Sequence, residues 1–174
     1  MAELRAVAIA GSPRSPSKSK ALAEMLLAHL ERGGCATGTV DVAALPADAL
    51  LARAPAAELD AAIARVGGAQ IVIAASPTYR ALYTGALKCF FDLMPPQHLH
   101  GKVCVPVLTA ASPAHFLALE HGFAPLFASL EGTPAPGVYA TDAQFIDGAP
   151  DAALSRRVEY AAGAALALAR ALAG

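Results

Sequence analysis

The chain has 174 residues, and 13 Lys and Arg residues against 14 Asp and Glu residues give a formal net charge of -1 at pH 7. This length suits one compact domain with its own core, and we predict a single domain over residues 1–174. The near-neutral charge argues against a nucleic-acid-binding protein, which needs a basic surface, and against a disordered acidic chain.

The mean hydropathy is positive, +0.48, but no segment is expected to cross a membrane. The longest uncharged run, residues 103–119, is interrupted by Pro106 and Pro113, whereas a membrane-spanning helix needs about 20 mostly apolar residues. The apolar run after Arg5 is too short for the core of a secretory signal. The three cysteines form no CxxC pair and are odd in number, which is typical of reduced thiols. We expect a cytoplasmic protein.

Short apolar runs alternate with stretches of helical composition from one end of the chain to the other. The predicted strands cover residues 4–10, 37–43, 70–75, 102–109 and 137–140, and the predicted helices cover 19–32, 58–66, 85–94, 113–130 and 152–173. Glycine pairs and a proline pair follow the first three helices, as expected where helices end. The Pro- and Ala-rich connection over 44–57 is expected to be a mobile loop.

The central predicted strands are continuous apolar runs rather than alternating ones. Strands buried on both faces have this pattern, so we predict a five-stranded parallel sheet with helices on both faces. Ligands of such sheets bind beyond the carboxyl ends of the strands. The segments that follow the first, third and fourth strands are therefore the candidates for a site.

The segment after the first strand, residues 11–19, combines hydroxyl groups with a guanidinium. Ser12, Ser15, Ser17 and Ser19 surround Arg14, and a helix begins within the segment. This inventory favours phosphate binding, through hydroxyl donors, a charged partner and the free N–H groups of a helix N-terminus. The glycine spacing matches neither a dinucleotide-binding fingerprint nor a Walker P-loop. A flexible Ser/Pro turn that ends in a helix cap remains the alternative.

The other two segments offer an aromatic surface and small residues. Residues 76–88 hold Tyr79, Arg80 and Tyr83 close together, and Thr84-Gly85 begins the next helix. Tyr79 could lie against a planar ligand, although both tyrosines could instead pack over the strand ends. The third segment, residues 109–113, has small residues that let a ligand approach backbone N–H groups.

These segments resemble those of a known family. The stretches GSPRSPSKS, SPTYRALYTGALKCFFDLMP, GKVCVPVLTAASPAHFLALEHGF and GVYATDAQFID are similar to those of the NAD(P)H-dependent FMN reductases of the flavodoxin-like superfamily. Within that family the chain is most similar to reductases paired with two-component sulfonate monooxygenases. The resemblance implies a flavodoxin-like fold, a dimer or homotetramer, FMN and NAD(P)H as cofactors, and an FMNH2-dependent monooxygenase as partner.

The resemblance also implies a set of cofactor-binding residues. The phosphate loop falls on Ser12, Arg14, Ser15, Ser17 and Ser19; the isoalloxazine and ribityl contacts fall on Pro77, Thr78, Tyr79 and Arg80, with Tyr83, Thr84 and Gly85 shaping the loop; the pyrimidine end falls on Thr109, Ala110, Ala111 and Ser112. Relatives commonly have two glycines in place of Ala110-Ala111, so these alanines keep the backbone donors but narrow the pocket.

His121 marks a second departure from these relatives. Alkanesulfonate-type reductases carry a tyrosine there, in a helix widened by one inserted residue at a subunit interface, and a histidine is closer to the methanesulfonate-type branch. We expect His121 to influence flavin exchange at an interface, with an ordinary exposed helical histidine as the alternative. The pair His98 and His100 lacks further ligands at useful spacing, so no metal site is expected.

The expected reaction is hydride transfer from NAD(P)H to FMN, for which no catalytic acid, base or nucleophile is assigned. Three alternatives remain open: a reductase that keeps FMN bound and reduces quinones, azo dyes or metal oxyanions; a flavodoxin-type electron carrier; and a regulatory domain without a ligand. Flavodoxins are usually strongly acidic and have a tryptophan at the flavin, whereas this chain has no Trp. The residues do not distinguish NADH from NADPH.

Overall fold

A parallel sheet forms the centre of the computed structural model, which describes residues 3–173. The strand order is β2-β1-β3-β4-β5, and β6 also pairs with β4. The strands are β1 (Arg5–Ala10), β2 (Ala36–Asp41), β3 (Ile71–Pro77), β4 (Val103–Ala110), β5 (Thr133–Pro134) and β6 (Val138–Thr141). The predicted flavodoxin-like parallel sheet is confirmed, and the central strands β3 and β4 are buried on both faces, as their apolar runs indicated.

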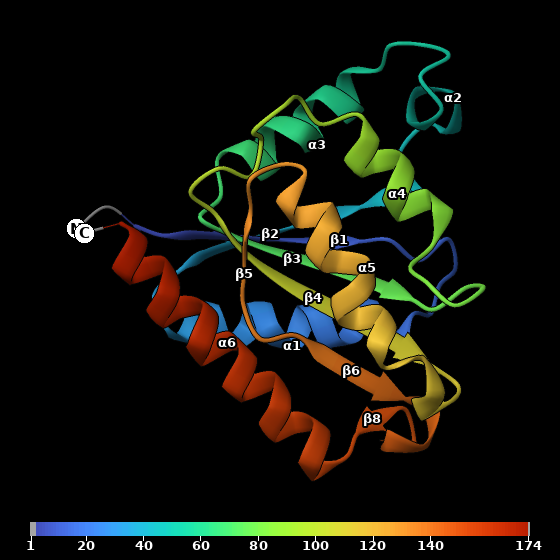
Figure 1. The fold of residues 1–174 in the computed structure, drawn as a ribbon, viewed down its shortest axis with the longest axis vertical. Helices are drawn as coiled ribbons and strands as arrows, with labels where there is room; N and C mark the ends of the chain where they lie inside the picture. The colour runs from blue at the N-terminus through green and yellow to red at the C-terminus, as the bar shows by residue number, and fades with distance from the viewer. Residues whose placement is uncertain (1–2, 174) are drawn as a thin grey trace.

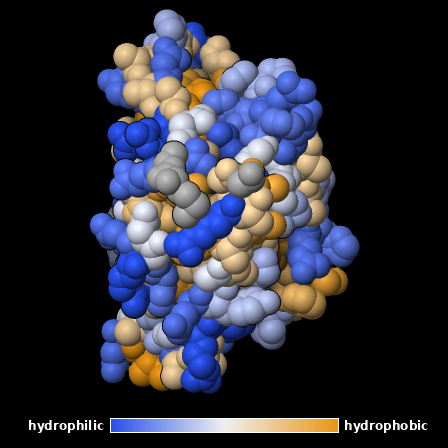
Figure 2. Space-filling model, turned by 90° about the vertical axis from the view of Figure 1, so that its left-hand side faces the viewer, coloured by the Kyte–Doolittle hydropathy of each residue, from blue (hydrophilic) through white to orange (hydrophobic). Residues whose placement is uncertain are grey.

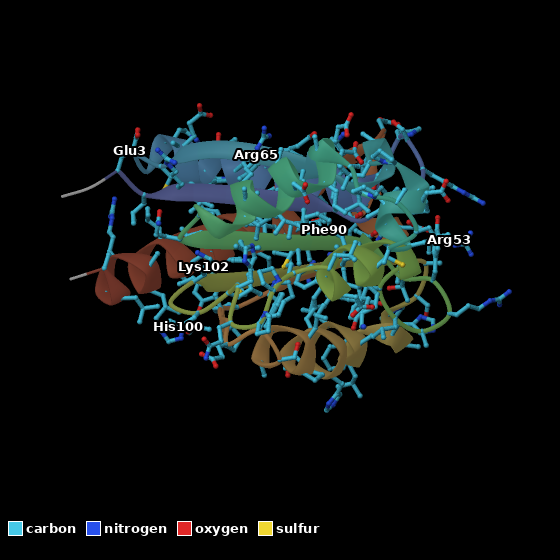
Figure 3. The ribbon with its side chains drawn as sticks, turned by 90° about the horizontal axis from the view of Figure 1, so that it is seen from above. Glu3, Arg53, Arg65, Phe90, His100 and Lys102 are labelled. Atoms are coloured by element: carbon cyan, nitrogen blue, oxygen red, sulfur yellow. The ribbon has the colours of Figure 1, made fainter. Side chains whose placement is uncertain are left out.

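Helices cover both faces of this sheet (Figure 1). They are α1 (Lys18–Arg32), α2 (Ala47–Leu50), α3 (Ala57–Gly67), α4 (Gly85–Asp92), α5 (Leu117–Ala128) and α6 (Ala152–Leu172). On one face α1 and α6 pack against each other and on the sheet; on the other lie α3, α4 and α5, with Phe90 pointing into the apolar layer beneath them (Figure 3). Each layer has its own apolar core, so the sheet is shielded on both sides.

One predicted element is divided in the structure, and one short strand is added to the predicted set. The helix expected over 113–130 begins with a separate 3-10 turn, Pro113–His115, because the Ser112 side chain caps that turn, and α5 follows it. The fifth strand expected over 137–140 is confirmed as β6, and a short strand outside the predicted range, β5, precedes it; both pair with β4. Pro134 and Pro136 have no N–H to donate, which explains the interruption at this outer edge.

The connection over 44–57 differs from the predicted mobile loop. It contains α2, whose Ala49 is 1% exposed, and Leu45 and Leu50 pack against the same apolar core. Burial of these side chains holds the segment against the sheet. A small antiparallel hairpin of β7 (Phe145–Ile146) and β8 (Ala149–Pro150), absent from the predicted elements, precedes α6.

The two ends of the strands lie on opposite sides of the molecule. The face that carries both chain ends is a mixture of hydrophilic and hydrophobic side chains (Figure 2). The arrowheads of β3 and β4, and hence the carboxyl ends of the strands, lie on the opposite side of the molecule (Figure 1). Among the described residues, no helix is long and apolar enough to span a lipid bilayer.

Candidate functional site

A cavity of about 550 Å³ lies at the carboxyl ends of β1, β3 and β4, where the sequence predicts a site. Its volume is in the range of small-molecule sites in proteins. We call it the carboxyl-end cavity. Its lining comes from the three predicted segments and from the region after β6: Ser12, Arg14, Pro16, Ser17, Lys18, Ala21, Pro77, Thr78, Tyr79, Thr109, Ala110, Ala111, Asp142 and Gly148.

The first segment forms a tight turn that leads into α1. The Ser12 hydroxyl donates to the Arg14 carbonyl over 2.9 Å and accepts from the Arg14 N–H over 3.2 Å. Ser17 is the N-cap of α1, and its side chain accepts from the Lys20 N–H. The first N–H groups of α1 and the Arg14 guanidinium therefore lie at one end of the cavity, an arrangement that favours an anion such as a phosphate.

A buried polar network joins the first segment to the second. The Thr84 hydroxyl donates to the Gly11 carbonyl, and the Thr84 N–H donates to the Ser76 hydroxyl over 2.9 Å. Thr84 and Ser76 are 2% and 0% exposed, so both groups are shielded from water. A Cβ at Gly11 would lie only 2.6 Å from the Leu87 Cβ, which shows how closely the two segments approach. This network holds the base of the cavity together.

The second segment reverses direction within four residues. Tyr79 and Leu82 exchange backbone hydrogen bonds, and Arg80 and Ala81 both have positive φ. The Thr78 N–H donates to the Thr109 carbonyl over 2.7 Å, which connects this loop to the end of β4. The turn leaves Tyr79 41% exposed at the rim of the cavity, where its ring can contact a planar ligand.

One polar atom in the cavity wall lacks a partner. The Thr78 Oγ1 is buried and has no hydrogen-bond partner among the atoms of residues 3–173. An unpaired buried hydroxyl is unfavourable, and such groups are rare in proteins without a functional reason. Thr78 lines the carboxyl-end cavity, so a rotation of its side chain would let this hydroxyl pair with a polar group bound there.

The third segment is held in place by Tyr139. Its hydroxyl, on β6, donates to the Ser112 carbonyl over 2.5 Å, and the Ser112 side chain accepts from the Ala114 N–H over 3.2 Å. Burial raises the pKa of Tyr139, so its hydroxyl remains protonated and able to donate at neutral pH. The backbone of Ala110 and Ala111 is fixed at the cavity by these contacts.

The cavity brings together nine of the residues that the sequence predicted, Ser12, Arg14, Ser17, Pro77, Thr78, Tyr79, Thr109, Ala110 and Ala111. Thr84 and Ser19 are buried beneath their loops and support them, and Ser112 caps the following turn. Ser15, Arg80 and Gly85 lie on the same loops, outside the residues that line the cavity. Lys18 and Asp142 line the cavity as well but are not among the predicted cofactor-binding residues, although Asp142 directly follows a strand at the edge where ligands of such sheets bind.

Tyr83 and His121 line a second cavity, of about 420 Å³, between the 79–84 loop and α5, which we call the α5 cavity. Here α5 is an α-helix that contains Pro125, and His121 is exposed. Tyr83 packs on Phe123 with a ring separation of 5.0 Å, and burial raises the pKa of its hydroxyl. Gly122 lets the helix approach Leu82, since a Cβ there would overlap the Leu82 side chain.

His115 also lines the α5 cavity, whereas the other three histidines and the cysteines line neither cavity. His100 and Lys102 are at the end of the molecule that carries Glu3, whereas Arg53 marks the other end (Figure 3). His98 and His100 contact the Ile63 carbonyl and Glu131 respectively. Cys35 and Cys104 are buried and Cys89 is half-buried, all three as free thiols. No group of metal-ligating side chains is found among residues 3–173.

Fold and cavity together define a flavodoxin-like α/β protein with a loop rich in serine and arginine at the carboxyl ends of its strands. A Streptococcus pneumonia flavodoxin shares the fold, with a TM-score of 0.64 over 94% of this chain and 97% of that chain at 15% identity. Residues 4–146 match the family model of the NADPH-dependent FMN reductases. The chain therefore belongs to the NADPH-dependent FMN reductase family and is an enzyme of the flavin reductase class.

Individual relatives agree with this assignment. The chain is 35% identical over 83% of its length to the Escherichia coli FMN reductase (NADPH), of which it covers 76%. It is 36% identical to the NADH-dependent FMN reductase SfnF of Pseudomonas fluorescens, over 83% of this chain and 80% of that protein. The apo crystal structure of the NADH:FMN oxidoreductase EMOB superimposes with a TM-score of 0.87 at 33% identity, covering 97% and 89% of the two chains.

Proposed function

We propose that this protein reduces FMN with NADH or NADPH in the carboxyl-end cavity and releases the reduced flavin to a separate, sulfonate-type monooxygenase. The observation that carries the proposal is the composition of that cavity, which places an anion-binding loop, an exposed tyrosine ring and an unpaired buried hydroxyl side by side. FMN has a phosphate at one end and a planar ring with polar edge atoms at the other, so the residues present fit this cofactor.

In this proposal the first segment holds the phosphate. The side chains of Ser12, Arg14 and Ser17 and the N–H groups at the start of α1 supply the donors, while Ser15 adds a hydroxyl on the same loop and buried Ser19 supports Ser17 through a 3.0 Å contact. Hydrogen bonds that involve a charged group are about twice as strong as neutral ones, so Arg14 contributes most among these side chains.

The ring end is assigned to the second and third segments. Pro77, Thr78 and Tyr79 form one wall, with Arg80, Tyr83, Thr84 and Gly85 shaping the loop, and Thr109, Ala110, Ala111 and Ser112 form the other. Bound FMN supplies the hydride-accepting chemistry, so the chain needs no acid, base or nucleophile of its own. Its residues would bind the flavin, orient the rings and exclude water, and the N–H groups of Ala110–Ser112 would stabilise negative charge that develops on the flavin.

Two features of the cavity favour release of the reduced flavin. Its rim is exposed, and alanines occupy positions 110 and 111. Tyr79 and Arg14 are exposed, and alanines stand where relatives commonly have glycines, so the cavity holds its ligand less tightly than an enclosed site. Several relatives are named for FMN reduction itself, which supports FMN as the substrate that leaves. Three free thiols agree with a cytoplasmic setting.

The α5 cavity is the proposed contact region between subunits of a dimer or tetramer. Phe116 and Leu117 are 54% and 52% exposed beside it, and such large apolar side chains are typical of interfaces when they cluster. His121 lines the same cavity as Leu82, which belongs to the turn that carries Tyr79. In this arrangement His121 connects subunit contact to flavin exchange.

The test is steady-state oxidation of NADH and of NADPH by the purified protein, with FMN titrated from zero. Rates that saturate with free FMN are the expected result, and the same data give the preferred nucleotide. A yellow protein whose rate ignores added FMN but requires a quinone or dye would indicate a reductase with bound flavin. FMN binding without turnover of either nucleotide would indicate an electron carrier, and either outcome would overturn the proposal.

A further inference from the structure

Two side chains of opposite charge face each other at the phosphate-loop end of the carboxyl-end cavity. The Lys18 Nζ lies 2.7 Å from the Asp142 Oδ1, and both residues line the cavity together with Arg14. They are 124 positions apart in the chain, so the pair forms only in the folded protein. Neither residue is among those that the family resemblance assigns to the cofactor.

The position of the Lys18 ammonium follows from the elements around it. Lys18 is the first residue of α1, directly after the N-cap Ser17, and therefore adds a full charge beside the positive end of the helix dipole. Asp142 follows β6 and begins a 3-10 turn, and the Lys18 Nζ also lies 5.1 Å from the centroid of the Phe145 ring. The long lysine side chain is thus held from two sides by residues 142–145.

The charges around the cavity predict how Lys18 and Asp142 affect its affinity for an anion. The charged lining side chains are Arg14, Lys18 and Asp142, which sum to a net charge of +1. Removing the charge of Lys18 leaves zero, and removing the charge of Asp142 leaves +2. A phosphate monoester carries about -1.5 to -2 at pH 7, so its affinity must respond in opposite directions to these two changes.

The pair contributes little to folding. The side chains of Lys18 and Asp142 are 43% and 56% exposed, and exposed ion pairs add little to stability because water screens them. Its location at the mouth of an anion-binding loop is better explained by an effect on the ligand. A lysine held in place by a carboxylate attracts a phosphate, while the carboxylate offsets part of that attraction.

We propose that Lys18 is a specificity-determining residue that favours flavins with a 5′-phosphate over riboflavin, and that Asp142 positions Lys18 and weakens this preference enough for the flavin to exchange. The proposal rests on the proposed function, since it assumes that FMN is the ligand of the carboxyl-end cavity. It adds the chemical basis on which the enzyme selects its flavin and the residue that keeps the selected flavin exchangeable.

The experiment compares the dissociation constants of FMN and riboflavin, measured from the quenching of flavin fluorescence, for the wild type and for Lys18→Gln, Lys18→Arg and Asp142→Asn. Riboflavin shares the ring and ribityl chain but has no phosphate. Lys18→Gln should weaken FMN binding about fivefold, and Asp142→Asn should strengthen it about threefold, as expected for one screened charge. The affinity for riboflavin should change less than about twofold in Lys18→Gln and in Asp142→Asn. Lys18→Arg keeps the positive charge and should therefore keep the wild-type preference for FMN over riboflavin.

The ion pair between Lys20 and Asp41 provides the matched control. It has the same 2.7 Å separation, similar exposure and a lysine on the same helix, but neither residue lines the cavity. Lys20→Gln and Asp41→Asn should leave the ratio of the two dissociation constants unchanged. Equal losses for FMN and riboflavin in the Lys18 or Asp142 variants would show a merely structural role and overturn the inference.

Failure of this inference can be told apart from failure of the proposed function. If the wild type reduces FMN but neither Lys18→Gln nor Asp142→Asn changes the ratio of FMN to riboflavin affinity, only the role of Lys18 and Asp142 is overturned. If the wild type neither binds nor reduces FMN, the proposed function fails first, and the inference fails with it.

Discussion

Three hydroxyl groups near the carboxyl-end cavity differ in whether the protein itself satisfies them. Thr84 donates to Gly11 and Tyr139 donates to Ser112, whereas Thr78 Oγ1 is buried without a partner among the described residues. A hydroxyl that is hydrogen-bonded within the protein holds a loop in position, while an unpaired hydroxyl can still form a hydrogen bond with a ligand. Substitutions at Thr78 and Tyr139 should therefore have different consequences.

Thr78→Val replaces the unpaired hydroxyl with a methyl group of similar shape. Because the hydroxyl is unsatisfied without ligand, the variant should match or exceed the wild type in unfolding free energy, by up to about 1 kcal/mol. Its FMN dissociation constant should rise about fivefold, since the ligand loses a partner. Thermal denaturation with and without FMN measures both effects, with Thr37→Val on the exposed part of β2 as control. A variant that binds FMN as the wild type does would contradict the assignment of this wall.

Tyr139→Phe removes only the hydroxyl that holds the Ser112 carbonyl. The loss of one hydrogen bond should lower the unfolding free energy by about 1 kcal/mol. Because the backbone at Ala110 and Ala111 becomes less fixed, the KM for FMN should increase about threefold with little change in kcat. Steady-state kinetics and thermal denaturation check this result. Tyr160→Phe is the control, since Tyr160 is 68% exposed on α6. If Tyr139→Phe loses stability without a change in KM, Tyr139 has a role in folding alone.

At the scale of elements, α5 and α6 each contain a glycine, and the two glycines have different surroundings. Gly122 in α5 lies against Leu82 and Tyr83 of the 79–84 loop, whereas nothing lies within 4 Å of a Cβ built on Gly163 in α6. Glycine is unfavourable in a helix unless close packing requires it. Only Gly122 has such a reason, because it lets α5 approach the loop that carries Tyr79.

Substitution by alanine should therefore change the unfolding free energy in opposite directions at these two glycines. Gly122→Ala should lower the unfolding free energy by about 1 kcal/mol or less and raise the KM for FMN, because the Leu82 side chain must rotate away from the new methyl group and Leu82 belongs to the turn that carries Tyr79. Gly163→Ala should raise the unfolding free energy by about 0.5–1 kcal/mol, from helix propensity alone, and leave kinetics unchanged. Chemical denaturation and steady-state rates test both, and a stabilised Gly122→Ala would show that the contact with Leu82 is loose.

The molecule as a whole has a predictable response to alkaline pH. Burial raises the pKa of the Cys104 thiol to about 12, from its ordinary value of 9.0. Since the folded-state pKa is the higher one, its contribution to stability is complete below about pH 9 and is lost as the pH rises toward 12. Burial also raises the pKa of Tyr83 and Tyr139, which adds loss of the same sign above their ordinary pKa.

We expect the unfolding free energy to fall by about 2 kcal/mol between about pH 8 and about pH 10.5 from the Cys104 contribution. Cys104→Ala should be less stable at the lower pH, because it leaves a cavity, but should show a smaller decline with pH. Cys89→Ala, at a half-buried position, should keep the wild-type decline. Denaturant titrations at the two pH values give the result, and equal declines in the Cys104 and Cys89 variants would assign the alkaline loss to other groups.

Local sequence patterns were sufficient to establish the class of sheet and the location of the site. Continuous apolar runs such as residues 71–75 require burial on both faces, and this condition leads to a parallel sheet whose ligands bind at the carboxyl ends of its strands. For that reason the amino-acid sequence alone predicts that Ser12, Thr78 and Ala110 lie together, and all three line the carboxyl-end cavity. These inferences depend on local periodicity and on the edge at which each segment leaves the sheet.

The side-chain contacts across long separations, by contrast, are a property of the assembled fold. The pairing of Lys18 with Asp142, the contact of Tyr139 with Ser112 and the unpaired state of Thr78 depend on strand order, register and side-chain direction. Local periodicity carries no information on these, because a residue of α1 and a residue after β6 become neighbours only when the sheet is assembled. The pairing of β6 with β4, which brings Asp142 to the carboxyl end of β4, belongs to this same level of structure.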